Sequence, residues 1–81
     1  MDLRSARATV QHFGRQVRAY RKAAGITQIE LSRLSRVTSK YISEIELGTS
    51  NPSLMTMVLV ADELECSVAE LLEERGRGKG R

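Results

Sequence analysis

The stretch TQIELSRLSRVTSKYISEIELG, residues 27–48, decides the fold because it predicts two short helices joined by a tight turn. Thr27 and Glu30 have the spacing of a capping box, in which the threonine hydroxyl caps the helix and the glutamate reaches back to the backbone of the cap. We therefore expect a helix from about residue 28 to residue 35.

The second half of this stretch predicts a helix of similar length. Arg36 and Val37 form the turn, and Thr38 stands where a hydroxyl caps a helix over about 39–47. Gly48 follows at the place where helices commonly end in a left-handed glycine.

The first helix is expected to bury Leu31 and Leu34, and the residues expected to hold the two helices together are Leu31, Val37, Ile42 and Ile45. Two helices joined in this way form a helix–turn–helix. An α-helix fits the major groove of DNA, and its first residues reach the base edges there. The outward side chains of the second helix are Ser39, Lys40, Ser43 and Glu44, with Tyr41 beside them.

Further helices are expected on both sides of this pair. Apolar residues recur at helical spacing over about 10–24, and Gly25 follows as a cap. An earlier start, near Leu3, is left open because residues 3–8 are polar enough to fray. Another helix is predicted over about 53–65, after a polar loop.

A second capping box, Ser67 and Glu70, starts a fifth helix that reaches about residue 74. No stretch alternates with period two for long enough to predict a strand, so the fold class is all-α with five helices. We expect a flexible segment over 1–9, one DNA-binding domain over 10–74 and a disordered basic tail over 75–81.

Charge is segregated along the chain, whose formal net charge is +3. Residues 1–43 hold nine Lys and Arg against two acids, which leaves +7, and residues 44–74 hold eight acids and no base. Residues 75–81 add four bases separated by glycines. Such a chain presents a basic front to a polyanion, and the tail either lies along phosphates or only aids solubility.

Several kinds of protein are excluded by the residues that are scarce. One cysteine, Cys66, cannot form an internal disulfide, and with the one histidine, His12, it cannot build a four-ligand zinc site. Neither has a partner for nucleophilic catalysis. We expect no enzyme, metal or cofactor, and a cytoplasmic, nucleoid-associated protein, because a signal peptide and a membrane span are both missing.

A series of residues matches a known pattern in both order and spacing. The series is Ala24-Gly25-Ile26-Thr27-Gln28, Leu31-Ser32, Val37-Thr38, Tyr41-Ile42-Ser43, Ile45-Glu46, Gly48, Asn51-Pro52-Ser53, Leu64 and Leu71-Leu72. Through these residues the sequence resembles the Cro/phage-repressor (XRE) type of helix–turn–helix regulator over roughly residues 13–72, and among these the small controller proteins of restriction–modification systems. This resemblance implies a five-helix, lambda-repressor-like fold.

The resemblance also implies roles for individual residues. Gln28 takes the position of a phosphate contact, and Arg21 and Glu46 match an ion pair that ties the first helix to the third. The base- and backbone-contacting positions are Thr38, Ser39, Lys40 and Glu44, and the loop positions near flanking phosphates are Ser50 and Asn51.

The chain departs from the family pattern at two positions. Arg36 stands after the second helix and Glu65 after the fourth, where the family often has glycine for a left-handed backbone. Both departures are compatible with the fold, but they affect the turn geometry and so the orientation of the recognition helix.

Several candidate contacts have an alternative interpretation. Lys40 contacts a guanine or a phosphate, or is solvated, and Glu44 accepts from cytosine or pairs with Lys40 within the helix. Tyr41 donates to a phosphate or packs its ring. Ser43 contacts DNA or is an ordinary exposed serine, and Arg36 touches the DNA backbone or only solvent.

The segment 54–61 has apolar residues all round the helix. Leu54, Met57 and Val58 are among those expected to face the core, which leaves a surplus for a partner surface. We expect a twofold dimer through this surplus, although a Met-rich core could absorb it. The expected dimer residues are Met55, Leu59, Val60, Val68 and Leu72.

The sequence therefore predicts a dimeric, sequence-specific regulator of transcription that binds double-stranded DNA at a pseudo-palindromic operator, with the helix over 39–47 in the major groove. Two alternatives remain open at this point. One is an antitoxin that binds a toxin through its last two helices, and the other is a protein-interaction module of the transcription machinery.

Overall fold

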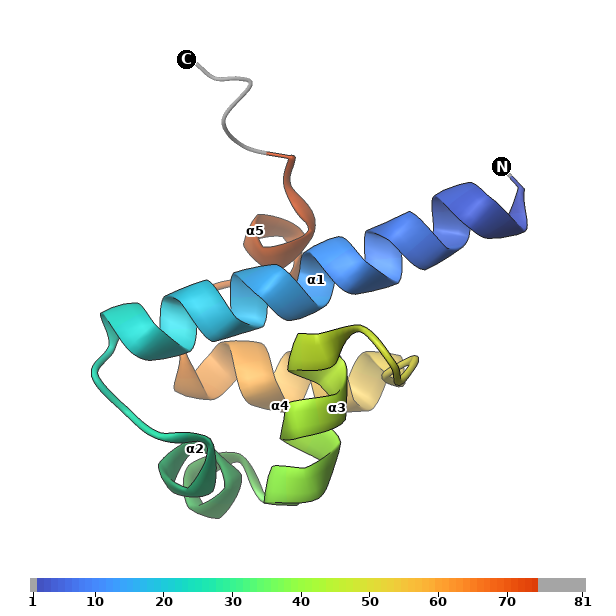
Figure 1. Ribbon diagram of the computed structural model, residues 1–81. Helices are drawn as coiled ribbons and strands as arrows, with labels where there is room; N and C mark the ends of the chain where they lie inside the picture. The colour runs from blue at the N-terminus through green and yellow to red at the C-terminus, as the bar shows by residue number, and fades with distance from the viewer. Residues whose placement is uncertain (1, 75–81) are drawn as a thin grey trace.

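The computed structural model of the 81-residue chain describes residues 2–74, which form five α-helices and no strand (Figure 1). The all-α expectation is confirmed. The long helix α1 lies across α3, and α5 packs on α1 from the other side. The helices are α1 (Leu3–Ala23), α2 (Gln28–Ser35), α3 (Ser39–Leu47), α4 (Leu54–Glu63) and α5 (Val68–Leu72).

Helix α1 begins seven residues before the expected start near residue 10, so the segment expected to be flexible is helical from Leu3 onward. The Asp2 carboxylate caps this helix by accepting a hydrogen bond from the Ser5 backbone N–H at 2.9 Å, and this bond lowers the pKa of the Asp2 carboxyl. The polar character of the first turns hid this start. The expected tail over 75–81 lies outside the described residues.

The helices α2 and α3 have the expected bounds, and their caps explain why. The Glu30 backbone N–H donates to Thr27 and the Thr27 backbone N–H donates to Glu30, which completes the capping box. The second capping box, Ser67 with Glu70, is also present. Helix α4 starts one residue later and ends two residues earlier than expected, and α5 ends two residues before the expected residue 74.

The core is aliphatic with one aromatic ring. Leu34 was expected in the core, and this is wrong because Leu34 is 54% exposed. Helix α2 lasts only two turns, and its buried side consists of Leu31 and Ser35, whose hydroxyl donates to the Leu31 carbonyl. The buried apolar residues are Phe13, Val17, Leu31, Val37, Ile42, Ile45, Val60, Ala61, Leu64 and Leu71.

Gly14 sets how closely α1 approaches α3. A methyl group added at Gly14 would lie 1.9 Å from the Ile45 carbonyl oxygen, which is far inside van der Waals contact. Only glycine therefore allows the two backbones to meet at this point.

Arg36 and Glu65 both adopt the left-handed backbone that the family pattern assigns to glycine. Their φ angles are 69° and 58°. The departures at these positions thus leave the turn conformation unchanged, and each places a side chain in a region that favours glycine by about 1–2 kcal/mol.

Candidate nucleic-acid interface

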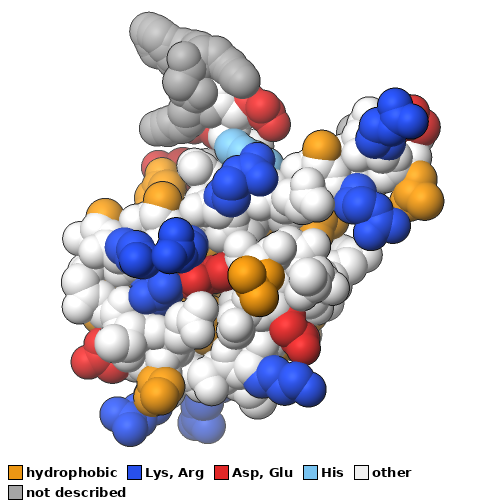
Figure 2. Space-filling model, in the orientation of Figure 1, with side chains coloured by type: hydrophobic (Ala, Val, Ile, Leu, Met, Phe, Trp, Pro, Cys, Tyr) orange, Lys and Arg blue, Asp and Glu red, His pale blue; other side chains and the backbone are white. Residues whose placement is uncertain are grey.

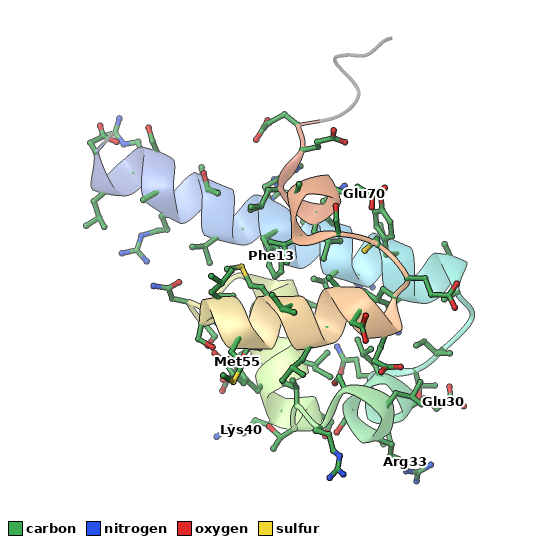
Figure 3. The ribbon with its side chains drawn as sticks, turned by 180° about the vertical axis from the view of Figure 1, so that it is seen from behind. Phe13, Glu30, Arg33, Lys40, Met55 and Glu70 are labelled. Carbon is green, nitrogen blue, oxygen red and sulfur yellow. The ribbon has the colours of Figure 1, made fainter. Side chains whose placement is uncertain are left out.

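Helix α3 is held in the molecule along one side and presents its other side to solvent. Ile42 and Ile45 are buried in the core, and Lys40 points away from the body of the protein (Figure 3). Within residues 2–74, the outward side chains make no hydrogen bond or ion pair with the rest of the chain, and they are Ser39, Lys40, Ser43 and Glu44.

The end of α3 is joined to α1 by the ion pair that the resemblance implies. The Arg21 guanidinium donates from Nε to Glu46 Oε2 at 2.7 Å and from Nη2 to Glu46 Oε1 at 3.0 Å. The two side chains are 9% and 3% exposed, so the pair is shielded from water. The hydrogen bonds to Glu46 raise the pKa of Arg21 and keep the guanidinium charged. Arg21 Nη1 also donates to the Ile26 carbonyl at 2.8 Å, which ties down the turn before α2.

Gln28 is turned inward in part. Its side-chain Nε2 donates to Glu46 Oε1 at 3.0 Å, because the buried carboxylate at the end of α3 is the nearest strong acceptor. The side chain is only half-buried. Gln28 therefore lies at the surface beside the start of α2, where its expected phosphate contact remains a prediction.

Thr38 and Tyr41 have structural partners. The Thr38 hydroxyl accepts from the Tyr41 backbone N–H at 3.2 Å and so caps α3. The Tyr41 ring packs against the core while the side chain stays half-buried, which favours the packing interpretation of this residue.

The other expected contacts lie around the outward face. Lys40 and Glu44 form no ion pair with each other among the described residues, so the alternative of an intrahelical pair is not observed. Ser50 and Asn51 lie in the loop after α3 and line a surface groove, and Arg36 is exposed at the turn. Their contacts with DNA remain predictions.

Sequence reasoning missed two residues of this region. Leu47 follows Glu44 by three positions, lies on the outward side of α3 and is 72% exposed. Its helical spacing was the available signal. The second missed residue is Gly14. A glycine inside an otherwise regular helical pattern indicates a close approach of two backbones.

The structure leaves some of the expected dimer residues exposed and buries others. Met55 is 73% exposed, and Leu59 and Leu72 are also exposed, whereas Val68 is half-buried. Val60 is wrong as a dimer residue, because it is 1% exposed and belongs to the core of the single chain.

Helix α4 therefore presents a different side to solvent from the side that we expected. Leu54 and Val58, expected in the core, are 65% and 50% exposed. Helix α4 packs on both α2 and α5, and these two neighbours bury the side that carries Val60 and Ala61.

The structure also bears on metal binding and membranes. Among the described residues, no cluster of three His, Cys, Asp or Glu side chains could hold a metal ion. No helix in residues 2–74 has the length and apolar character needed to cross a membrane. Cys66 packs against the core, and burial raises the pKa of its thiol.

Two short helices, joined by a turn whose Val37 is buried, together with the polar outward side of α3, define a helix-turn-helix protein. Comparison with known proteins agrees: the helix-turn-helix family model matches residues 17–71, and the chain belongs to this family, in its XRE type. The resemblance stated from the sequence is thus confirmed.

The proteins similar in sequence include a transcriptional regulator and a control protein. The chain is 41% identical over 58 residues to the uncharacterized helix-turn-helix transcriptional regulator y4dL of Sinorhizobium fredii, a match that covers 72% of this chain and 30% of that protein. It is 33% identical over 60 residues to the control protein C.SmaI of Serratia marcescens, which covers 74% of this chain and 71% of that one.

A solved structure is similar throughout the body of the fold. The restriction-modification controller protein C.AhdI from Aeromonas hydrophila superposes with a TM-score of 0.76 and 33% identity, over 79% of this chain and 97% of that chain. The chain is therefore a member of a family whose named relatives are transcriptional regulators and controller proteins.

Proposed function

We propose that this protein regulates transcription by binding a specific pseudo-palindromic duplex as a dimer, with α3 of each copy in a major groove. The observation that carries the proposal is the combination of a fixed helix and free polar side chains. Glu46 and two buried isoleucines hold α3 in one orientation. Ser39, Lys40 and Glu44 are left free to reach base edges.

The charge of the surroundings supports the same proposal. Lys and Arg side chains lie on the face that α3 shares with α1 and α2 (Figure 2). Phosphate contacts supply affinity and position, and base contacts supply discrimination. Gln28 at the start of α2 would add a phosphate contact beside the helix N-terminus.

The exposed apolar side of α4 supports a dimer. Leu54, Met55, Val58 and Leu59 are all at least 40% exposed on one short helix. A contiguous apolar surface of this kind usually marks an interface. A twofold dimer would present two copies of α3 about 34–36 Å apart, one turn of DNA.

Selection of duplexes from a random pool tests the DNA part of this proposal. We expect enrichment of a pseudo-palindrome, and we expect Lys40→Ala to change the preferred bases within each half. Arg33→Ala is the matched control, because Arg33 is an exposed base that belongs to α2 and not to the outward side of α3. Enrichment of no sequence by the intact protein would refute sequence-specific binding.

Sedimentation equilibrium tests the dimer. Met55→Glu places a charge in the exposed apolar surface of α4 and is expected to give monomers. The control Leu34→Glu places the same charge at an exposed leucine of α2 and should leave the assembly unchanged. A wild-type protein that stays monomeric with and without the selected duplex would contradict the dimer.

A further inference from the structure

The bases of α1 lie on one side of the helix from end to end. With 3.6 residues per turn, five of its six Lys and Arg side chains fall within an arc of about 80°. The sixth, Arg21, is the buried partner of Glu46. We call these five residues the basic stripe, and they are Arg4, Arg7, Arg15, Arg18 and Lys22.

All five residues of the basic stripe are exposed, and none has an acidic partner in the described part of the chain. The single ion pair among residues 2–74 is the one between Arg21 and Glu46. Five like charges along one helix repel each other, so the stripe favours an anionic partner along its length.

The basic stripe lies on the side of α1 that meets the end of α3. Gly14 abuts the backbone of Ile45, and the Gln11 side chain lies against Gly48. Figure 2 shows blue side chains in a row along α1, on the same face of the molecule on which Figure 1 shows α3 in front of α4.

Arg7 contributes to a surface groove at the amino-terminal end of this stripe. The groove has a volume of about 230 Å³ and runs between the first turns of α1 and the loop after α3. Its lining includes Arg7, Thr49, Ser50 and Asn51. A guanidinium, hydroxyls and an amide are groups that bind phosphate oxygens.

The stripe extends to both sides of the recognition helix. Arg7 and Arg18 are separated by eleven residues, or about 16 Å along the axis of α1. Gly14, where α1 meets α3, lies between them. A major groove is about 12 Å wide, so bases on either side of a helix inserted in it face the two opposite strands.

We propose that the amino-terminal half of α1 binds backbone phosphates of one DNA strand through Arg4, Arg7 and the groove beside residues 48–51. Arg18 and Lys22, at the other end of the basic stripe, approach the opposite strand. This inference rests on the proposed function. It assigns a contact surface to turns of α1 that precede the family match, which begins at residue 17.

The test is the salt dependence of binding to the selected duplex. Each phosphate contact adds about 0.9 to the slope of log affinity against log salt. Arg7→Gln should therefore lower the slope by about 1, so that between 50 and 200 mM salt the variant loses about 3.5-fold less affinity than the wild type. The base preference of the variant should be unchanged, because phosphate contacts do not read sequence.

Arg33→Gln is the matched control, because it removes the same charge from an exposed position on α2 outside the stripe. A slope that falls equally in both variants would overturn the proposal, since net charge alone would then explain it. An unchanged slope in Arg7→Gln would also overturn it, and circular dichroism would establish that both variants fold.

Three other results distinguish the alternatives. If Arg7→Gln weakens self-association and leaves the salt slope unchanged, the stripe binds the acidic side of a second copy and the inference is wrong. If Lys40→Ala still changes the selected bases while Arg7→Gln has no effect, the proposed function stands without this surface. If the intact protein selects no duplex, the proposed function itself fails.

Discussion

Removal of the Glu46 carboxylate would leave a charged guanidinium almost without water or a counter-ion. The Arg21 side chain is 9% exposed and loses two short hydrogen bonds in Glu46→Leu. Breaking one half of a buried pair costs about 3–5 kcal/mol. A domain of this size has about 4–12 kcal/mol of stability in total, so the melting temperature should fall by 12 °C or more, at about 4–8 °C per kcal/mol.

The same reasoning predicts recovery when both charges are removed. In Arg21→Met/Glu46→Leu, apolar side chains of similar volume replace the pair, and such replacements are often neutral or stabilising. The Ile26 carbonyl loses its Arg21 donor in this variant, which costs about 1 kcal/mol. The double variant should therefore be more stable than Glu46→Leu alone.

Urea unfolding of the wild type, both single variants and the double variant, followed by circular dichroism, measures this coupling. We expect an interaction energy of about 2–3 kcal/mol between the two sites. Additive losses in the double variant would refute the reasoning, because α1 and α3 would then be held together by the core alone.

Three further predictions follow from local geometry. Gly14→Ala should destabilise the fold by at least about 1–3 kcal/mol in thermal unfolding, although alanine is the better helix former, because its methyl group meets the Ile45 carbonyl. Arg36→Gly and Glu65→Gly should each stabilise by up to about 1 kcal/mol, since both backbones are left-handed, and a loss in both would contradict this. Burial raises the pKa of the Cys66 thiol, so the folded state favours the neutral form of this group. The free energy of unfolding should therefore fall as the pH rises above the ordinary thiol pKa of 9.0. The variant Cys66→Ser should lack this contribution to the pH dependence.

Local signals in the sequence predicted the parts of the fold that depend on local chemistry. The capping boxes at Thr27 and Ser67 need only residues three positions apart, and both are present. The bounds of α2 and α3 follow from such caps. The pair of Arg21 and Glu46, in contrast, lies 25 residues apart, and only the family resemblance indicated it.

The errors occur where the outcome depends on packing between distant segments. Helix α4 is apolar on all sides, so periodicity alone could not select Val60 for the core or Val58 for the surface. Leu34 was placed in the core on helical spacing from Leu31, but the buried side of α2 consists of Leu31 and Ser35. The start of α1 at Leu3 was left open by the sequence, because Asp2 caps turns that carry few apolar residues.

The free outward side of α3 has a consequence for how binding preference can change over time. Its four polar side chains contribute no bond to the framework formed by residues 2–74, and surface substitutions of this kind usually alter stability by no more than about 0.5 kcal/mol. A gene that encodes this chain can therefore acquire new recognition residues in single steps without passing through an unfolded intermediate. The same independence makes Ser39, Lys40, Ser43 and Glu44 suitable positions for a combinatorial library on an otherwise constant scaffold.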